Sequence, residues 1–182
     1  TREISGRELA RLEERKINIT RVSGSVCFPA AFILVCAMNP CRCGYFGHPT
    51  HPCSCSDTSR RSYVSKISGP LLDRIDIQVQ VDGVKYSELS SDEETETSEI
   101  VKKRVDRTRL IQKERFKDDG ILTNADMGER QIKKYCVLSA DCEKILRGAY
   151  ERLGLSPRAR SRIIKVARTI ADMELSEKIL PQ

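Results

Sequence analysis

The 182-residue sequence contains no tryptophan, and aromatic residues make up only 5% of it. Any core that the chain forms must therefore be mostly aliphatic. No apolar run approaches the roughly 20 residues that a membrane-spanning helix needs, and the N-terminus lacks the charged-then-apolar pattern of a signal peptide. We therefore expect a cytoplasmic protein without a membrane partner.

Two motifs of nucleotide hydrolysis are also absent. The phosphate loop G-x-x-x-x-G-K-[ST] does not occur, and no apolar strand ends in Asp-Glu to hold Mg²⁺. We therefore expect no ATP hydrolysis from this chain alone. The net charge of +6 permits an anionic partner but does not establish one.

Cysteine, in contrast, is plentiful, with eight residues. Two Cys-x-Cys pairs lie in one loop rich in Pro, Gly and Ser, and four thiolates could supply a tetrahedral zinc site: Cys41, Cys43, Cys53 and Cys55. His48 and His51 lie in the same loop and could replace a thiol. The alternative is a set of reduced cysteines without a metal. The other four are expected to be small buried hydrophobic residues: Cys27, Cys36, Cys136 and Cys142.

The first half of the chain shows strand patterns separated by turns. Residues 17–21 alternate in polarity, Ser23-Gly24-Ser25 marks a turn, and an apolar strand is expected from about Ala31 to Val35. A Gly69-Pro70 break precedes Arg74, and residues 75–81 alternate with period two like a half-buried strand. From spacing alone, local pairing of Arg74 with Asp73 or Asp76 on a solvated turn is favoured over an arginine offered to a phosphate of another molecule.

The second half is predicted to be an all-α bundle. An acidic linker covers residues 88–99, and helices are expected at 97–116, 128–136, 140–153 and 157–173. Gly154 follows the third helix, and Ser156-Pro157 supplies an N-cap with proline at the first helical position. On the last helix, Ile163, Val166, Ala167 and Ile170 are expected to face the core, and Arg158 and Arg162 share another face.

Three segments resemble motifs of the magnesium-chelatase type of AAA+ ATPase. Phe32–Pro40 resembles the sensor-1 strand, Ser68–Val81 the arginine-finger segment, and Leu155–Asp172 the sensor-2 helix. The closest resemblance is to the bacterial branch that includes competence protein ComM. It implies an α/β plus α fold: residues 1–94 would be the rear part of the AAA+ nucleotide-binding core, and 95–182 its helical lid. The phosphate loop and magnesium acid of the family precede the matched region, so a larger ATPase is expected.

The resemblance assigns roles residue by residue. Asn39 would be sensor 1, and Arg74 the finger that acts on the nucleotide of a neighbouring subunit. Arg158 is the first candidate for sensor 2, with Arg162 and Arg168 as weaker ones. Without the resemblance, Asn39 reads as a turn residue and the arginines as a solvated helix face.

The same resemblance implies ATP and Mg²⁺ as cofactors, a homo-oligomeric ring (a hexamer), and DNA remodelling as the function. A hairpin before sensor 1 would offer DNA contacts from Lys16, Arg21, Ser23 and Ser25, although an ordinary solvated hairpin explains those residues as well. The alternatives are a magnesium-chelatase motor subunit, which acts on a protein and porphyrin partner, and a non-catalytic zinc-stabilised binding module.

Overall fold

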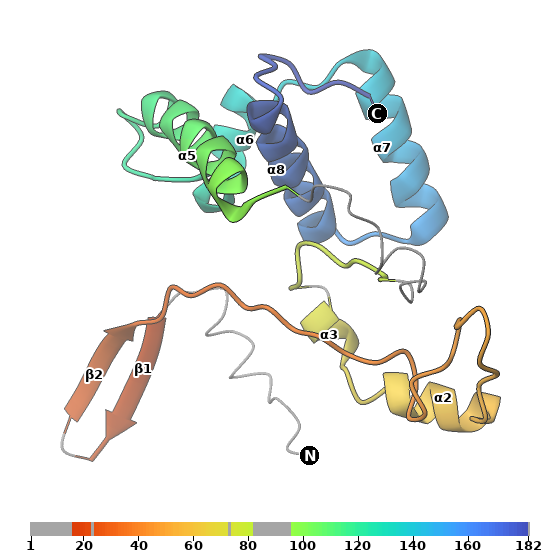
Figure 1. Cartoon of the computed structure of the whole chain (residues 1–182). Helices are drawn as coiled ribbons and strands as arrows, with labels where there is room; N and C mark the ends of the chain where they lie inside the picture. Colours follow the sequence, from red (N-terminus) through yellow and green to blue (C-terminus); the bar gives the residue numbers. More distant parts are fainter. Residues whose placement is uncertain (1–15, 23, 73, 82–95, 182) are drawn as a thin grey trace. The chain divides into compact units, whose positions relative to one another are not determined.

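The computed structural model describes residues 16–22, 24–72, 74–81 and 96–181, and the chain divides into two compact units, residues 1–90 and 91–182 (Figure 1). Across these described residues, no helix combines the length and apolar character that crossing a bilayer requires.

The first unit begins with a two-stranded antiparallel hairpin. Strand β1 (Lys16–Arg21) pairs with β2 (Gly24–Pro29) in a register that sets Ile17 opposite Phe28 and Thr20 opposite Ser25. Because side chains alternate along each strand, the hairpin has one apolar face and one polar face. The expected turn at residues 23–25 is displaced, since β2 already begins at Gly24.

The strands expected at residues 31–35 and 75–81 are not formed. Both segments lack regular structure, and their apolar side chains are exposed, including Ile33, Val35 and Val81. A strand needs paired neighbours for its backbone groups and a surface against which to bury its side chains. Neither segment has such a strand partner within the described residues. The expected sheet of the α/β core is therefore not present there.

Two helices follow the cysteine loop of this unit. Ser56 is the N-cap of helix α2 (Asp57–Val64), and its Oγ accepts a hydrogen bond from the Ser59 backbone N–H at 3.2 Å. The short α3 (Gly69–Leu72) starts at the Gly-Pro break. The backbone N–H groups of Arg74 and Ile75 bond back to its carbonyls, at 2.9 and 3.1 Å, so α3 holds Arg74 at its end.

The second unit is a helical bundle, and its four expected helices are confirmed. They are α5 (Ser98–Arg115), α6 (Glu129–Tyr135), α7 (Ala140–Leu153) and α8 (Pro157–Met173), with a 3₁₀ turn η1 (Asn124–Asp126). Side-chain caps fix three of the helix starts, at Thr97, Ser139 and Ser156. Helix α7 ends at Gly154, whose φ of 61° suits a residue without Cβ.

The core of the bundle is apolar and lies between α6, α7 and α8. Its buried members are Phe116, Met127, Ile132, Cys136, Cys142, Leu146, Ile164, Ala171 and Ile179. Cys136 and Cys142 are thus buried as expected. Cys27 and Cys36 are exposed, contrary to expectation, because the first lies on the polar face of the hairpin and the second in the unpaired segment after it.

The buried side of helix α5 is polar, and the buried side of α8 differs from the expectation. Helix α5 buries the polar Thr108 and Gln112, while Ile100 and Val105 stay exposed. Gln112 can be buried because its Oε1 accepts a hydrogen bond from the backbone N–H of Asn124 at 3.3 Å.

On α8, the buried positions are Ile164, Arg168, Ala171 and Asp172, and Ile163 and Ile170 are exposed. The core-facing stripe of this helix is therefore rotated toward the ion pair that Arg168 and Asp172 form.

Candidate functional site

The four loop cysteines converge on one point. The Sγ atom of Cys41 lies 3.3 Å from that of Cys43 and 3.6 Å from that of Cys53, and the four sulfur atoms, with that of Cys55, all lie within 4.8 Å of one another. Four sulfurs around a zinc ion at about 2.3 Å would be about 3.8 Å apart. A disulfide would need about 2 Å, and all eight cysteines are free. The four cysteines could therefore hold a metal ion.

Local backbone geometry brings the two pairs together. After Cys43 the chain turns at Gly44, which has a φ of 84° and whose N–H bonds to the Cys41 carbonyl at 3.1 Å. Arg60 of α2 fixes the other end of the loop, because its Nη1 donates to the carbonyl of Cys55 at 3.0 Å. The guanidinium of Arg60 also lies 4.4 Å from the ring centre of Phe46, which joins the middle of the loop to the helix.

The electrostatics of the cluster favour thiolate at one cysteine first. A hydrogen bond from the Tyr45 backbone and another from the Cys41 side chain lower the pKa of Cys43 to about 5. The pKa of Cys55 is raised to about 11: a backbone hydrogen bond from Cys43 opposes the rise, but the side-chain hydrogen bond with Cys43 and burial outweigh it. Adjacent thiolates repel one another, and a dication between them would remove that repulsion.

The two histidines of the loop do not join the cysteine cluster. The Nδ1 of His48 accepts the backbone N–H groups of Thr50 and His51, at 3.2 and 3.1 Å. The neutral ring therefore carries its proton on Nε2. The rings of His48 and His51 lie 5.0 Å apart, and each packs against Tyr45. In the described loop, therefore, neither histidine takes the place of a thiol in the cluster.

The two candidate catalytic residues lie in the same unit. Asn39 is exposed, and its Nδ2 lies 4.0 Å from where a Cβ on Gly44 would stand, so it is adjacent to the cysteine loop. It follows irregular chain rather than the apolar strand that was expected. Arg74 is half-buried just after α3. Asp73, its alternative local partner, lies outside the described residues.

The four DNA-contact candidates are not on one face of the hairpin. Lys16 and Ser25 share the polar face, where the Oγ of Ser25 lies 2.7 Å from Oγ1 of Thr20. Arg21 lies one position out of phase, on the side of Ile17 and Ile19. Ser23 is outside the described residues. Lys16 and the Thr20–Ser25 pair therefore share the polar face but lie at opposite ends of the hairpin, within the described residues.

The arginines of α8 fall into two kinds. Arg158 is exposed and Arg162 half-buried, one turn apart at the start of the helix. Arg168 is only 4% exposed, and it donates to Asp172 and to the carbonyls of Ser176 and Glu177. Those bonds fasten the chain that follows α8. Arg168, the weaker sensor-2 candidate, is thus committed to the fold of the bundle.

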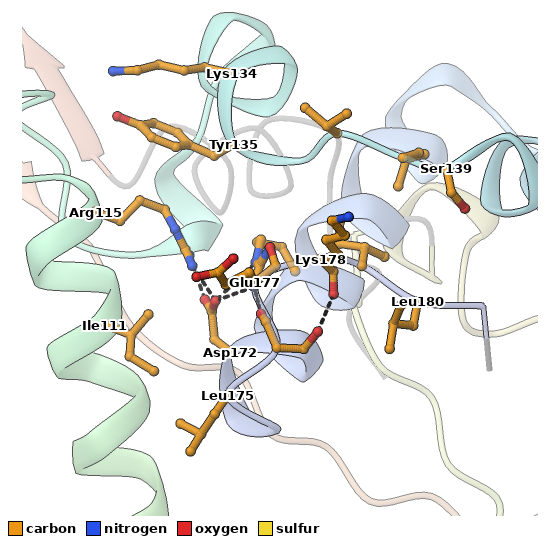
Figure 2. A pocket seen from close by; sticks show the side chains of 15 residues that line it. Ile111, Arg115, Lys134, Tyr135, Ser139, Asp172, Leu175, Glu177, Lys178 and Leu180 are labelled. Carbon is orange, nitrogen blue, oxygen red and sulfur yellow. Dashed lines mark hydrogen bonds and ion pairs between the residues drawn. The ribbon is translucent and has the colours of Figure 1, made fainter.

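Asp172 is the centre of a buried polar network that no sequence motif predicted. Its carboxylate accepts hydrogen bonds from Arg115 (Figure 2), from Arg168 at 3.0 Å and from Asn124 at 2.8 Å. Burial by itself would raise the pKa of Asp172, but the hydrogen bonds from Arg115 and Asn124 hold its pKa below the usual value. The only local signal was the i, i+4 spacing of Arg168 and Asp172, because Arg115 is 57 residues away in sequence.

This network borders a cavity of about 760 Å³ between α5, α6 and the chain after α8. Figure 2 shows Arg115 pointing to Asp172 at its wall, with Tyr135 and Leu180 among the other lining residues. Besides Arg115 and Arg168, which contact Asp172, the cavity is lined by Lys134, Glu177 and Lys178, so its walls carry charges of both signs.

Comparisons with known proteins agree for both units. Residues 7–89 match the family "Magnesium chelatase, subunit ChlI", and residues 95–182 match "Magnesium chelatase, subunit ChlI C-terminal". The chain therefore belongs to the magnesium-chelatase-like family, whose fold is related to that of AAA+ proteins.

Within that family the chain is similar to YifB of Salmonella typhimurium and to competence protein ComM of Haemophilus influenzae. It is 38% identical to YifB, and the match covers 94% of this chain and 33% of YifB. It is 36% identical to ComM, and that match covers 92% of this chain and 32% of ComM. Rv2897c of Mycobacterium tuberculosis is 35% identical over 89% and 32%. The chain thus spans about a third of the length of the curated relatives that it matches.

Proposed function

We propose that the chain is the C-terminal part of a ComM-like AAA+ ATPase, in which a homo-oligomeric ring, a hexamer, couples ATP hydrolysis to the remodelling of DNA. The observation that carries this proposal is the match of both halves, in order, to the two magnesium chelatase families, together with 36% identity to competence protein ComM over almost the whole chain. ATP and Mg²⁺ would be bound mainly by residues outside this chain, because it has no phosphate loop.

Within this ring, Arg74 would act in trans on the nucleotide of the neighbouring subunit, and Asn39 would position the attacking water. A guanidinium suits the role of Arg74 because it is planar, permanently charged and bidentate toward phosphate. The position of Arg74 at the end of α3 supports the proposal, since a hydrogen-bonded turn fixes its backbone. Arg158, with Arg162 one turn later, is the proposed sensor 2. Its exposure supports this choice over Arg168, which the bundle holds by three acceptors.

The test is the ATPase rate of the full-length protein with and without single-stranded DNA. We expect stimulation by DNA, and a fall of roughly 10³ to 10⁵ in hydrolysis for Arg74→Ala with nucleotide binding largely retained. Arg74→Lys should rescue little, because a point charge does not replace the fork. A ring without DNA stimulation that instead responds to a protein and porphyrin partner would make it a chelatase motor.

Subunit mixing tests the trans arrangement. Arg74→Ala subunits combined with subunits whose phosphate loop is broken should regain some activity, because interfaces with an intact loop and an intact finger then form. Normal hydrolysis by Arg74→Ala alone would show that the arginine is a surface residue.

We further propose that Cys41, Cys43, Cys53 and Cys55 bind one structural Zn²⁺. The support is the convergence of four free sulfurs in a loop with few apolar residues to order it. The ion would hold the two ends of the loop together. Protein purified without added zinc should contain about one equivalent of the metal, which Cys53→Ser should lose.

Cys27→Ser and Cys36→Ser are the matched controls, because both thiols are exposed and lie outside the cluster. Retention of metal in Cys53→Ser, or its absence from the wild-type chain, would reject the site.

A further inference from the structure

A set of aromatic rings, exposed except for the half-buried His48, lies on the cysteine loop and is not used by the sulfur cluster. We call it the aromatic platform: Tyr45, Phe46, His48 and His51. The ring centres of Tyr45 and His51 are 5.2 Å apart, with 53° between their planes. Tyr45 is 45% exposed and Phe46 50% exposed, so roughly half of each side chain contacts solvent. In a chain with 5% aromatic residues, such a concentration at one surface loop is unusual.

The rings are held in place by the loop and α2. His48 is fixed by the two backbone N–H groups that its Nδ1 accepts, and it packs edge-on against Tyr45. Phe46 lies under the guanidinium of Arg60, which in turn is anchored to Asp57 and to the Cys55 carbonyl. The platform is therefore pre-organised, which lowers the entropy cost of binding a flat ligand.

The segment that carries the platform is basic. Between residues 40 and 66 there are four basic side chains and one acidic side chain, Asp57. The segment stays basic even with the two formal negative charges that a zinc tetrathiolate would carry. Arg42 and Arg61 are exposed, and within the described part of the chain neither forms an ion pair. These two arginines can therefore meet phosphates without first giving up a carboxylate partner.

We propose that the aromatic platform binds single-stranded nucleic acid, with bases stacked on Tyr45 and His51 and phosphates held by Arg42 and Arg61. Aromatic rings beside cations are how proteins bind single strands without reading their sequence. A duplex hides its base faces, so the platform selects unpaired strands. This inference rests on the DNA-remodelling function proposed above, and it assigns the single-strand contact to the cysteine loop rather than to the hairpin.

The first test measures the affinity of the 182-residue chain for a fluorescein-labelled oligothymidylate by fluorescence anisotropy. Tyr45→Ala should raise Kd about fivefold or more, which corresponds to ~1 kcal/mol for one stacked base. Tyr45→Phe keeps the ring and should bind like the wild type. Phe28→Ala is the matched control, because Phe28 is 49% exposed but lies on the apolar face of the hairpin. An abasic oligonucleotide should bind more weakly and respond little to Tyr45→Ala.

A second variant leaves the loop packing untouched. Arg61→Gln should reduce the slope of log K against log salt concentration by about 0.7, as expected for one phosphate contact on a single strand. Equal affinity of wild type and Tyr45→Ala, equal binding of normal and abasic strands, or no binding at all would overturn the proposal. If the chain binds no single strand at all, the aromatic platform is instead a contact surface for a protein partner.

The platform and the proposed function can fail separately. If DNA stimulates the full-length ATPase and Tyr45→Ala alters neither affinity nor stimulation, the function stands and the platform assignment is wrong. If DNA does not stimulate the ATPase but binding by the chain still depends on Tyr45, the platform stands and the remodelling function is wrong.

Discussion

Removing the carboxylate of Asp172 should cost the helical bundle much of its stability. The side chain is 1% exposed and forms ion pairs with two arginines, Arg115 and Arg168, of which Arg168 is itself 4% exposed. Asp172→Asn leaves the shape nearly unchanged but turns one oxygen into a donor that faces guanidinium N–H groups. Loss of one partner from a buried ion pair typically costs 3–5 kcal/mol, because the other charge stays buried without compensation. Domains have only about 0.05–0.15 kcal/mol of stability per residue, so this is a large share for a unit of residues 91–182.

The assay is urea denaturation followed by far-ultraviolet circular dichroism, whose helical signal comes mostly from α5, α7 and α8. Asp172→Asn should move the midpoint to much lower urea with a similar slope. The matched control is Asp106→Asn, since Asp106 forms an exposed i, i+4 pair with Lys102 that contributes little. A loss below about 1 kcal/mol for Asp172→Asn would refute the reasoning that the network stabilises the bundle.

Acid should reveal the same interaction. The folded state lowers the pKa of Asp172 below its unfolded value, so the folded state binds this proton less readily than the unfolded state does. The stabilisation is therefore complete above the ordinary aspartate pKa of about 3.9 and disappears as pH falls through the lower folded-state pKa. Between pH 7 and acid pH, wild type should lose more unfolding free energy than Asp172→Asn. Parallel curves for the two proteins would contradict this.

Three further outcomes are expected. Leu175 has a φ of 58° in the turn after α8, where the Ser176 N–H bonds to the Ala171 carbonyl. Leu175→Gly should therefore raise the melting temperature, because it relieves strain of about 1 kcal/mol, and a lower melting temperature would contradict this. Ser156→Ala removes the cap of α8 and should cost ~1 kcal/mol in urea unfolding, whereas the exposed Ser54→Ala should cost little. The purified chain should release no phosphate from ATP, and measurable turnover would disprove that.

Local signals predicted the helices well. The end of α7 and the start of α8 follow from Gly154 and Ser156, which act on backbone groups within four residues and so are readable from sequence. The hairpin was predicted only in part. Ser25, Val26, Cys27 and Phe28 alternate in polarity, but the turn was centred on Gly24, and β2 was therefore placed too late in the chain.

The expected strands failed for a different reason. A period-two or apolar pattern describes what a segment presents to its neighbours, but a strand forms only when those neighbours are there to accept its hydrogen bonds. Residues 31–35 and 75–81 carry the pattern without a partner among the described residues. The cysteine spacing predicted a cluster of four thiols, whereas nothing in the sequence predicted that the histidines would pack on Tyr45.

Helix α8 shows why arginines cannot be ranked by sequence alone. Arg158, Arg162 and Arg168 all lie on one predicted amphipathic helix, and each is a basic residue in a motif that resembles sensor 2. They differ in contacts with residues that are distant in sequence or lie beyond the helix. Arg115 and Asn124 fix Asp172, which pairs with Arg168, and the carbonyls of residues 176 and 177 accept hydrogen bonds from Arg168 after the end of the helix. Because these acceptors bond to Arg168, its guanidinium can be buried. A buried guanidinium that is already paired is not available to bind the phosphates of a nucleotide. Arg158 lies at the other end of α8 and is exposed to solvent, so burial separates two arginines that the helical pattern alone treats alike.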